Sequence, residues 1–156
     1  MNGVLSTAAL LLALGSGLST GVLFAFSSFV MRALGEVTQG AEAMQRINVV
    51  ILRSSFMPLF MGLALASLAV IVLAVMREQT PASPWLLAGG LLYLVGVFGV
   101  TAFFNVPLNN ELLAATPQTL GGVWANYLQS WTLWNHVRTV AGVGSSLAFI
   151  VAFRLS

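Results

Sequence analysis

Long stretches without a charged side chain constrain the fold of this chain more than any other feature. The first extends from Val4 to Met31, and its 28 residues exceed the about 20 that a helix needs to cross a bilayer. A second runs from Ser54 to Met76 and a third from Trp85 to Phe104. None alternates polar and apolar residues with a period of two, so membrane-spanning helices are favoured over barrel strands.

The last apolar run, from Val140 to Phe153, is too short to cross a bilayer by itself. Counting back about 20 residues from Phe153 reaches Trp134, so a fourth helix is expected over residues 134–153. Asn135, His136 and Arg138 then start inside the membrane boundary. Ionisable groups at that depth are costly and usually mark a functional site.

The composition supports an integral membrane protein. Only six arginines and four glutamates are charged among 156 residues, whereas about a quarter of a soluble domain is charged. The arginines are scattered, so no basic patch indicates a nucleic-acid partner. The first segment lacks a positive start and is longer than the about 7–15 apolar residues of a signal peptide, so it is expected to be a retained helix.

These patterns predict a single all-α domain over residues 1–156, a four-helix bundle embedded in the lipid bilayer. The expected spans are about residues 4–31, 50–76, 85–104 and 134–153. An interfacial helix is expected between the first two spans, running directly into the second, and a longer polar and aromatic connection before the fourth. We expect a bacterial inner or plasma membrane and both termini on one side.

Proline and small residues refine this expectation. Pro107 is expected to stop the third helix and to bias Val106 towards an extended backbone. The motif from Gly17 to Gly21 and the small residues from Gly142 to Ser146 allow close helix approach. Packing within one chain and homo-oligomerisation explain them equally well.

Aromatic residues recur at helical spacing before the fourth span. Trp124, Tyr127, Trp131 and Trp134 are three or four residues apart, and the next step reaches Arg138. An aromatic belt at the membrane surface is one explanation. A pocket for a flat ligand is the other, because such pockets combine aromatic walls with a few convergent polar groups.

Polar residues at other helix ends are further candidates. Asn105 ends the third apolar stretch, and Asn48 and Arg53 lie at the start of the second helix. Asn109 either contributes to a site or closes a turn. A single histidine and four dispersed glutamates cannot supply the ligands of a di-iron bundle or a facial triad, so no metal is expected.

Two motifs resemble the anthrone oxygenase-like family of small four-helix membrane proteins. One is the run Asn105-Val-Pro-Leu-Asn-Asn-Glu-Leu112, and the more specific one is Trp124-x-x-Tyr127-x-x-x-Trp131-x-x-Trp134-Asn135-His136-Val-Arg138-Thr139. The resemblance implies oxidation of polyketide anthrones to anthraquinones by O2 without a bound cofactor, as in fungal relatives. One departure is that relatives often carry a proline where this chain reads Val30-Met31-Arg32.

The leading hypothesis is therefore a cofactor-independent oxygenase acting on a small, flat, hydrophobic aromatic substrate. It makes His136 the general base and uses Asn105, Asn135 and Arg138 to hold the developing oxyanion. The expected substrate-binding residues are Tyr127, Trp131, Trp134, Asn48, Arg53 and Asn109.

Two other classes remain as alternatives. A non-catalytic subunit, scaffold or lipid- or small-molecule-binding protein predicts packed neighbours and no cavity beside His136 and Arg138. A transporter ranks last because the sequence has no clear internal repeat. The leading hypothesis expects a cavity between His136, Asn105 and Arg53.

Overall fold

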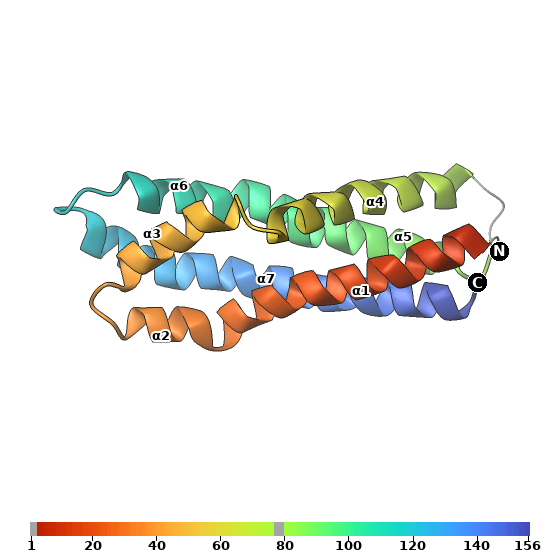
Figure 1. Cartoon of the computed structure of the whole chain (residues 1–156), viewed down its shortest axis with the longest axis horizontal. Helices are drawn as coiled ribbons and strands as arrows, with labels where there is room; N and C mark the ends of the chain where they lie inside the picture. The colour runs from red at the N-terminus through yellow and green to blue at the C-terminus, as the bar shows by residue number, and fades with distance from the viewer. Residues whose placement is uncertain (1–2, 77–79) are drawn as a thin grey trace.

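Four long helical segments form an elongated bundle in the computed structural model, which describes residues 3–76 and 80–156 (Figure 1). The described residues form helices and turns and contain no strand. The expected all-α four-helix bundle is thus confirmed, and all four segments are long and apolar enough to cross a membrane. In chain order the elements are α1 (Gly3–Ala25), η1 (Phe26–Val30), α2 (Met31–Gly35), α3 (Gly40–Ile51), α4 (Phe56–Met76), α5 (Ser83–Leu91), η2 (Leu92–Gly99), η3 (Thr101–Asn105), α6 (Val106–Ala114) and α7 (Leu120–Arg154).

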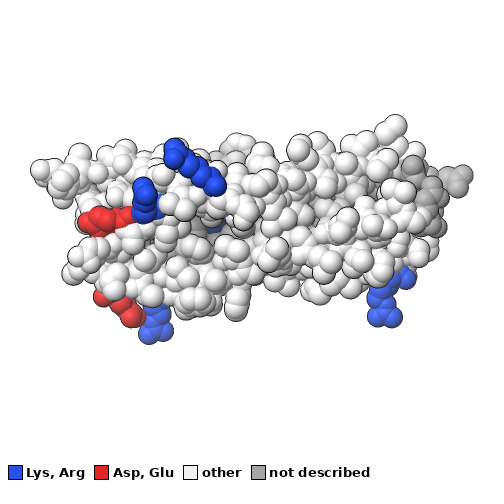
Figure 2. All heavy atoms as spheres, in the orientation of Figure 1, with Lys and Arg blue, Asp and Glu red and all other residues white. Residues whose placement is uncertain are grey.

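The outer surface matches a protein embedded in lipid. Figure 2 shows charged side chains near the two ends of the bundle and a middle region without them. The start of α1 and the end of α7 lie at the same end of the bundle (Figure 1). Many large apolar side chains between the ends face outwards, among them Leu18, Leu65 and Val140.

The two small-residue motifs pack against each other within the chain. A Cβ on Gly142 of α7 would collide with the side chain of Thr20 on α1. A Cβ on Gly17 would lie 3.4 Å from Ser146 Oγ, and that hydroxyl donates a 2.9 Å hydrogen bond to the Ala13 carbonyl oxygen. Close approach of α1 and α7 is therefore one use of these motifs.

Apolar side chains form two separate clusters along the bundle. The cluster nearer the termini includes Leu12, Phe60, Tyr93 and Phe149. The cluster at the other end consists of Met31, Met44, Leu112, Tyr127 and Trp131, with partly buried neighbours. Polar residues of three long helical segments, among them Ser27, Asn105 and Arg138, lie in chain order between residues of the two clusters. This level of the bundle holds the candidate site.

The helix expected between the first two spans is present as α3, but it does not run into the second span. It ends at Ile51, and α4 begins at Phe56 instead of residue 50. The Ser54 hydroxyl explains the break because it bonds backbone groups on both sides of the turn. It donates to the Ile51 carbonyl oxygen over 2.8 Å and accepts from the Phe56 amide over 3.3 Å.

Pro107 does not stop the third helical segment, contrary to the sequence expectation. Val106 is helical, with φ −63° and ψ −44°, and α6 continues to Ala114. The π-helical turn η3 directly before it gives a physical reason. A π-helical turn is wider than an α-helical one, which relieves the clash between the proline ring and the carbonyl four residues earlier. The long connection before the fourth span is consequently largely helical, with a short turn between α6 and α7.

Candidate functional site

Arg138 is the central residue of the buried polar level. Its side chain is only 6 % exposed. Nη2 donates a 2.6 Å hydrogen bond to Asn135 Oδ1, and Nη1 donates a 3.1 Å bond to Thr101 Oγ1. The guanidinium carbon lies 5.1 Å from the centre of the Trp131 ring, so the cation also rests on an aromatic face. Two residues of its own helix α7, Asn135 and Trp131, and Thr101 of η3 thus fix its position.

Two π-helical turns supply the partners of the α7 residues. In η1, Ser27 Oγ accepts a 2.8 Å bond from Asn135 Nδ2 and lies 3.1 Å from Thr139 Oγ1. In η3, Thr101 binds Arg138, and Asn105 Nδ2 donates to the Trp131 carbonyl oxygen over 3.2 Å. Short π-helical turns are rare and occur frequently at functional sites. Here both lie at the level of Arg138.

A second group of hydrogen-bonded side chains surrounds Trp131 and Tyr127, about two to three helical turns before Arg138 on α7. Asn109 Oδ1 accepts from the Tyr127 hydroxyl over 2.8 Å and from Trp131 Nε1 over 2.9 Å. Asn48 Nδ2 donates to the Tyr127 oxygen over 3.4 Å. The rings of Trp124, Tyr127 and Trp131 stack in series, with centroids 5.7 and 5.8 Å apart. The aromatic stripe is therefore a wall inside the bundle.

Among the residues predicted for the site, two buried polar atoms have no hydrogen-bond partner within the described residues. They are Arg138 Nε and Asn105 Oδ1. Within residues 3–76 and 80–156, Arg138 also forms no ion pair, since the pair found there joins Arg32 to Glu36 at the surface. A buried cation without a counterion is costly, and an unpaired donor adds to that cost. This chemistry suits a site for an anion.

A cavity of about 110 Å³ lies against Arg138. Its polar lining comes from Asn48, Thr101, Asn109 and Arg138, and Trp131 forms part of its wall. The remaining lining is apolar, from α1, η1, α3, α4 and α6: Val22, Leu23, Phe26, Met44, Ile47, Ile51, Leu52, Phe56, Met57, Phe60 and Val106. Convergent polar groups in an apolar cavity are typical of small-molecule sites.

A family model of anthrone oxygenase matches residues 49–148, which is more than half of the chain. This protein belongs to the anthrone oxygenase family. The match confirms the resemblance seen in the sequence, and it includes Arg138, Asn135, Asn105 and the aromatic wall. No curated protein and no solved structure matches the chain.

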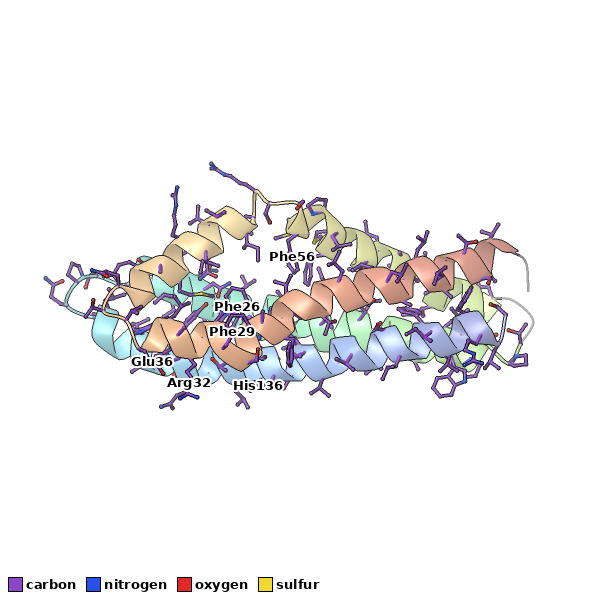
Figure 3. All side chains as sticks on the ribbon, turned by 60° about the horizontal axis from the view of Figure 1, so that its bottom comes forward. Phe26, Phe29, Arg32, Glu36, Phe56 and His136 are labelled. Atoms are coloured by element: carbon purple, nitrogen blue, oxygen red, sulfur yellow. The ribbon has the colours of Figure 1, made fainter. Side chains whose placement is uncertain are left out.

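Three of the residues predicted for the site of this anthrone oxygenase family member neither line the cavity nor are buried beside it. His136 is exposed on the outer surface of α7, and in Figure 3 it lies near Arg32, away from Phe56 and α3. Arg53 is exposed in the turn after α3. Trp134 is half-buried and stacks on Phe104, with ring centroids 3.8 Å apart. The cavity expected between His136, Asn105 and Arg53 lies instead between Asn48, Asn109 and Arg138.

The other predicted residues gather around the cavity. Asn48, Asn109, Trp131 and Arg138 line it, and Asn135, Asn105 and Tyr127 are buried partners of these residues. Sequence reasoning missed Ser27 and Thr101, whose hydroxyls form hydrogen bonds with α7. It also missed Phe26 and Phe56, which belong to the apolar lining of the cavity. The available signal was weak, because single hydroxyls are common in membrane helices.

No cluster of three or more histidine, aspartate or glutamate side chains capable of holding a metal occurs in the part of the chain that the structure describes. Asparagine, threonine and arginine provide the polar chemistry of the cavity. A single cation surrounded by neutral hydrogen-bonding groups can hold an anionic oxygen and stabilise charge that develops on it.

Proposed function

We propose that this protein is a membrane-embedded oxygenase that oxidises a flat, hydroxylated, anthrone-like aromatic with O2 and without a bound cofactor. The observation that carries the proposal is Arg138, a buried cation with no carboxylate partner among the described residues, beside an apolar cavity. Family membership supports an oxygenase-like role.

The proposed reaction needs an anionic substrate. An anthrone has an acidic methylene group, and loss of one proton places negative charge on its carbonyl oxygen. This enolate gives an electron to O2, and the resulting pair combines to form a carbon–oxygen bond. The peroxide anion takes up one proton from water, and loss of water from the hydroperoxide then gives the anthraquinone, so one oxygen atom enters the product and the other leaves in water.

Arg138 is the residue proposed to hold the enolate oxygen. A fixed donor in a site without water stabilises developing charge more than water does, because it needs no reorganisation. Asn135 and Thr101 occupy its two terminal nitrogens, whereas Nε has no partner within the described chain. The substrate oxygen would supply both the missing acceptor and the missing negative charge.

The aromatic wall is proposed to orient the rings. Trp131 lies between Tyr127 and the guanidinium group of Arg138. Its indole nitrogen is fixed by Asn109, so the ring plane is held. A flat substrate lying along this wall would bring its oxygen to Arg138.

Proton removal is proposed to occur without His136, since that side chain faces away from the cavity. Pairing with Arg138 favours the enolate over the neutral anthrone. The substrate therefore enters as the anion formed at the membrane surface, and its proton goes to water there.

Substitution of Arg138 tests the proposal. Arg138→Met in purified protein should lower O2 uptake and anthraquinone formation from an anthrone about 10²- to 10³-fold, the usual loss for an oxyanion donor. Arg154→Gln, at the exposed end of α7, is the matched control and should retain wild-type rates. Unchanged turnover in a folded Arg138→Met protein would exclude Arg138 as the oxyanion partner.

A binding protein without catalysis is the second candidate. The same two unpartnered atoms, Arg138 Nε and Asn105 Oδ1, favour it, because any bound ligand with matching groups would satisfy them. It predicts saturable anthrone binding without O2 uptake in the experiment above.

A further inference from the structure

The cavity beside Arg138 is too small for a three-ring substrate. Its volume is about 110 Å³. A cavity of about 150 Å³ holds a single benzene ring, and organic ligand sites usually measure about 300–1,000 Å³. A fused tricyclic ligand with its oxygen at Arg138 must therefore extend beyond this cavity.

A groove on the outside of the bundle adjoins the cavity. It measures about 370 Å³ and lies between α1 with η1 on one side and α3 with the start of α4 on the other. Five residues line both spaces, and all five are half-buried: Val22, Phe26, Ile47, Ile51 and Phe56. These five residues, the shared wall, are the only described side chains that the two linings have in common. Figure 3 shows Phe26 on the first helical segment and Phe56 at the start of α4.

We propose that the shared wall is the substrate entrance and that bound substrate occupies both spaces. This inference rests on the proposed function. The oxygen-bearing end of a fused tricyclic aromatic lies at Arg138, and its far ring passes between Phe26 and Phe56 into the groove. The groove opens on the side of the bundle beside Arg46, so the substrate anion enters there with its apolar rings against the lipid. The wall residues thereby set the length of substrate that is accepted.

The few attachments of α3 would allow the shared wall to open. Non-helical turns, residues 36–39 and 52–55, flank this helix. It packs on α2 and α6, whereas α1 packs mainly on α7. Two side-chain hydrogen bonds join it to other helices within the described residues. Gln45 Nε2 donates to the Leu112 carbonyl oxygen over 2.7 Å, and Asn48 Nδ2 donates to the Tyr127 hydroxyl oxygen over 3.4 Å. Small movements of α3 would separate Ile47 and Ile51 from Val22 and Phe26 without disturbing the α1–α7 contact.

The test uses the absence of cysteine from the natural sequence. The rate at which an unmodified Ile51→Cys protein oxidises an anthrone is the reference for the same protein after modification. Benzyl methanethiosulfonate should then add a ring inside the shared wall and lower turnover at least tenfold, and a reducing agent should restore it. Anthrone added first should slow the modification. Val22→Cys, on the facing helix, should behave in the same way.

Phe29→Cys is the matched control, because Phe29 lies in η1 beside Phe26 but is 63 % exposed and lines neither space. Its modification should leave turnover unchanged. The inference is overturned if modified Ile51→Cys and Val22→Cys keep full turnover, or if the reagent never reaches either thiol. Absence of turnover in the wild type and in unmodified variants would instead contradict the proposed function.

Discussion

At the scale of single residues, Arg138 and His136, the two ionisable candidates on α7, point to different sides of the helix. Residues 127, 131, 135 and 138 follow one another at intervals of three or four and are all buried. His136 is two positions before Arg138, which is about half a turn away at 3.6 residues per turn. The same helical spacing that predicted the aromatic stripe therefore places His136 on the outer surface.

This placement gives a prediction for His136. His136→Ala should retain O2 uptake with an anthrone within about threefold of wild type, because the side chain does not reach the cavity. Steady-state oxygen consumption by purified protein measures this. A loss approaching that of Arg138→Met would instead restore His136 as the general base.

At the scale of helices, close contact between α1 and α7 positions the groups around Arg138. Asn135 reaches across to the Leu23 carbonyl oxygen and Ser27, over 2.8 Å in each case. Such short side chains span two helices only when the backbones are near each other, and glycine permits this. Gly142 is the position where any added Cβ meets the neighbouring helix most closely along this contact.

Gly142→Leu should accordingly lower the free energy of unfolding by about 1–3 kcal/mol, the usual cost of overpacking. The matched control is Gly21→Leu, since a Cβ there meets nothing within 4 Å, and its effect should stay within about 0.5 kcal/mol. Denaturant titration in detergent micelles, followed by circular dichroism, measures both. Equal effects of the two substitutions would contradict the packing described for α1 and α7.

The number of membrane-spanning segments could be predicted from the sequence far more directly than the residues at which the helices begin and end. Charge-free length identified three of the spans, because burying a charge in lipid costs far more than any local preference. The fourth followed from counting back about 20 residues from Phe153. The break after Ile51 depends on one serine hydroxyl, and the continuation through Pro107 depends on a π-helical turn. Neither feature produces a periodic pattern of apolar residues in the sequence. The aromatic stripe and Arg138 were predictable because helical spacing alone brings them to one face.

At the scale of the whole molecule, the two apolar clusters divide the bundle into a stem near the termini and a head around α3 and α6. The stem consists mainly of long apolar helices, whereas the head contains the aromatic wall and the turns. The cavity lies where the two meet, so its rigid side comes from α7 and its adjustable side from α3.

An even number of membrane crossings should place both chain ends on one side. The start of α1 and the end of α7 lie at the same end of the bundle (Figure 1). Epitope tags fused at the N- and C-termini should therefore be cleaved by protease together. Cleavage should occur in one of two preparations, sealed right-side-out vesicles or sealed inside-out vesicles, and not in both. Opposite accessibility of the two tags would show that one of the four segments does not cross the bilayer.

The π-helical turns also make the site sensitive to chain length. Each such turn holds one residue more than the α-helical path would, so it acts as a phase shift of about 100° within an otherwise regular helix. Loss of a single residue from η1 or η3 could be absorbed as plain α-helix, with both flanking segments still apolar and still long enough for the membrane. Ser27 or Thr101 would then rotate away from α7. Family members that differ by one residue in these segments should thus share the fold while differing in what their cavities bind.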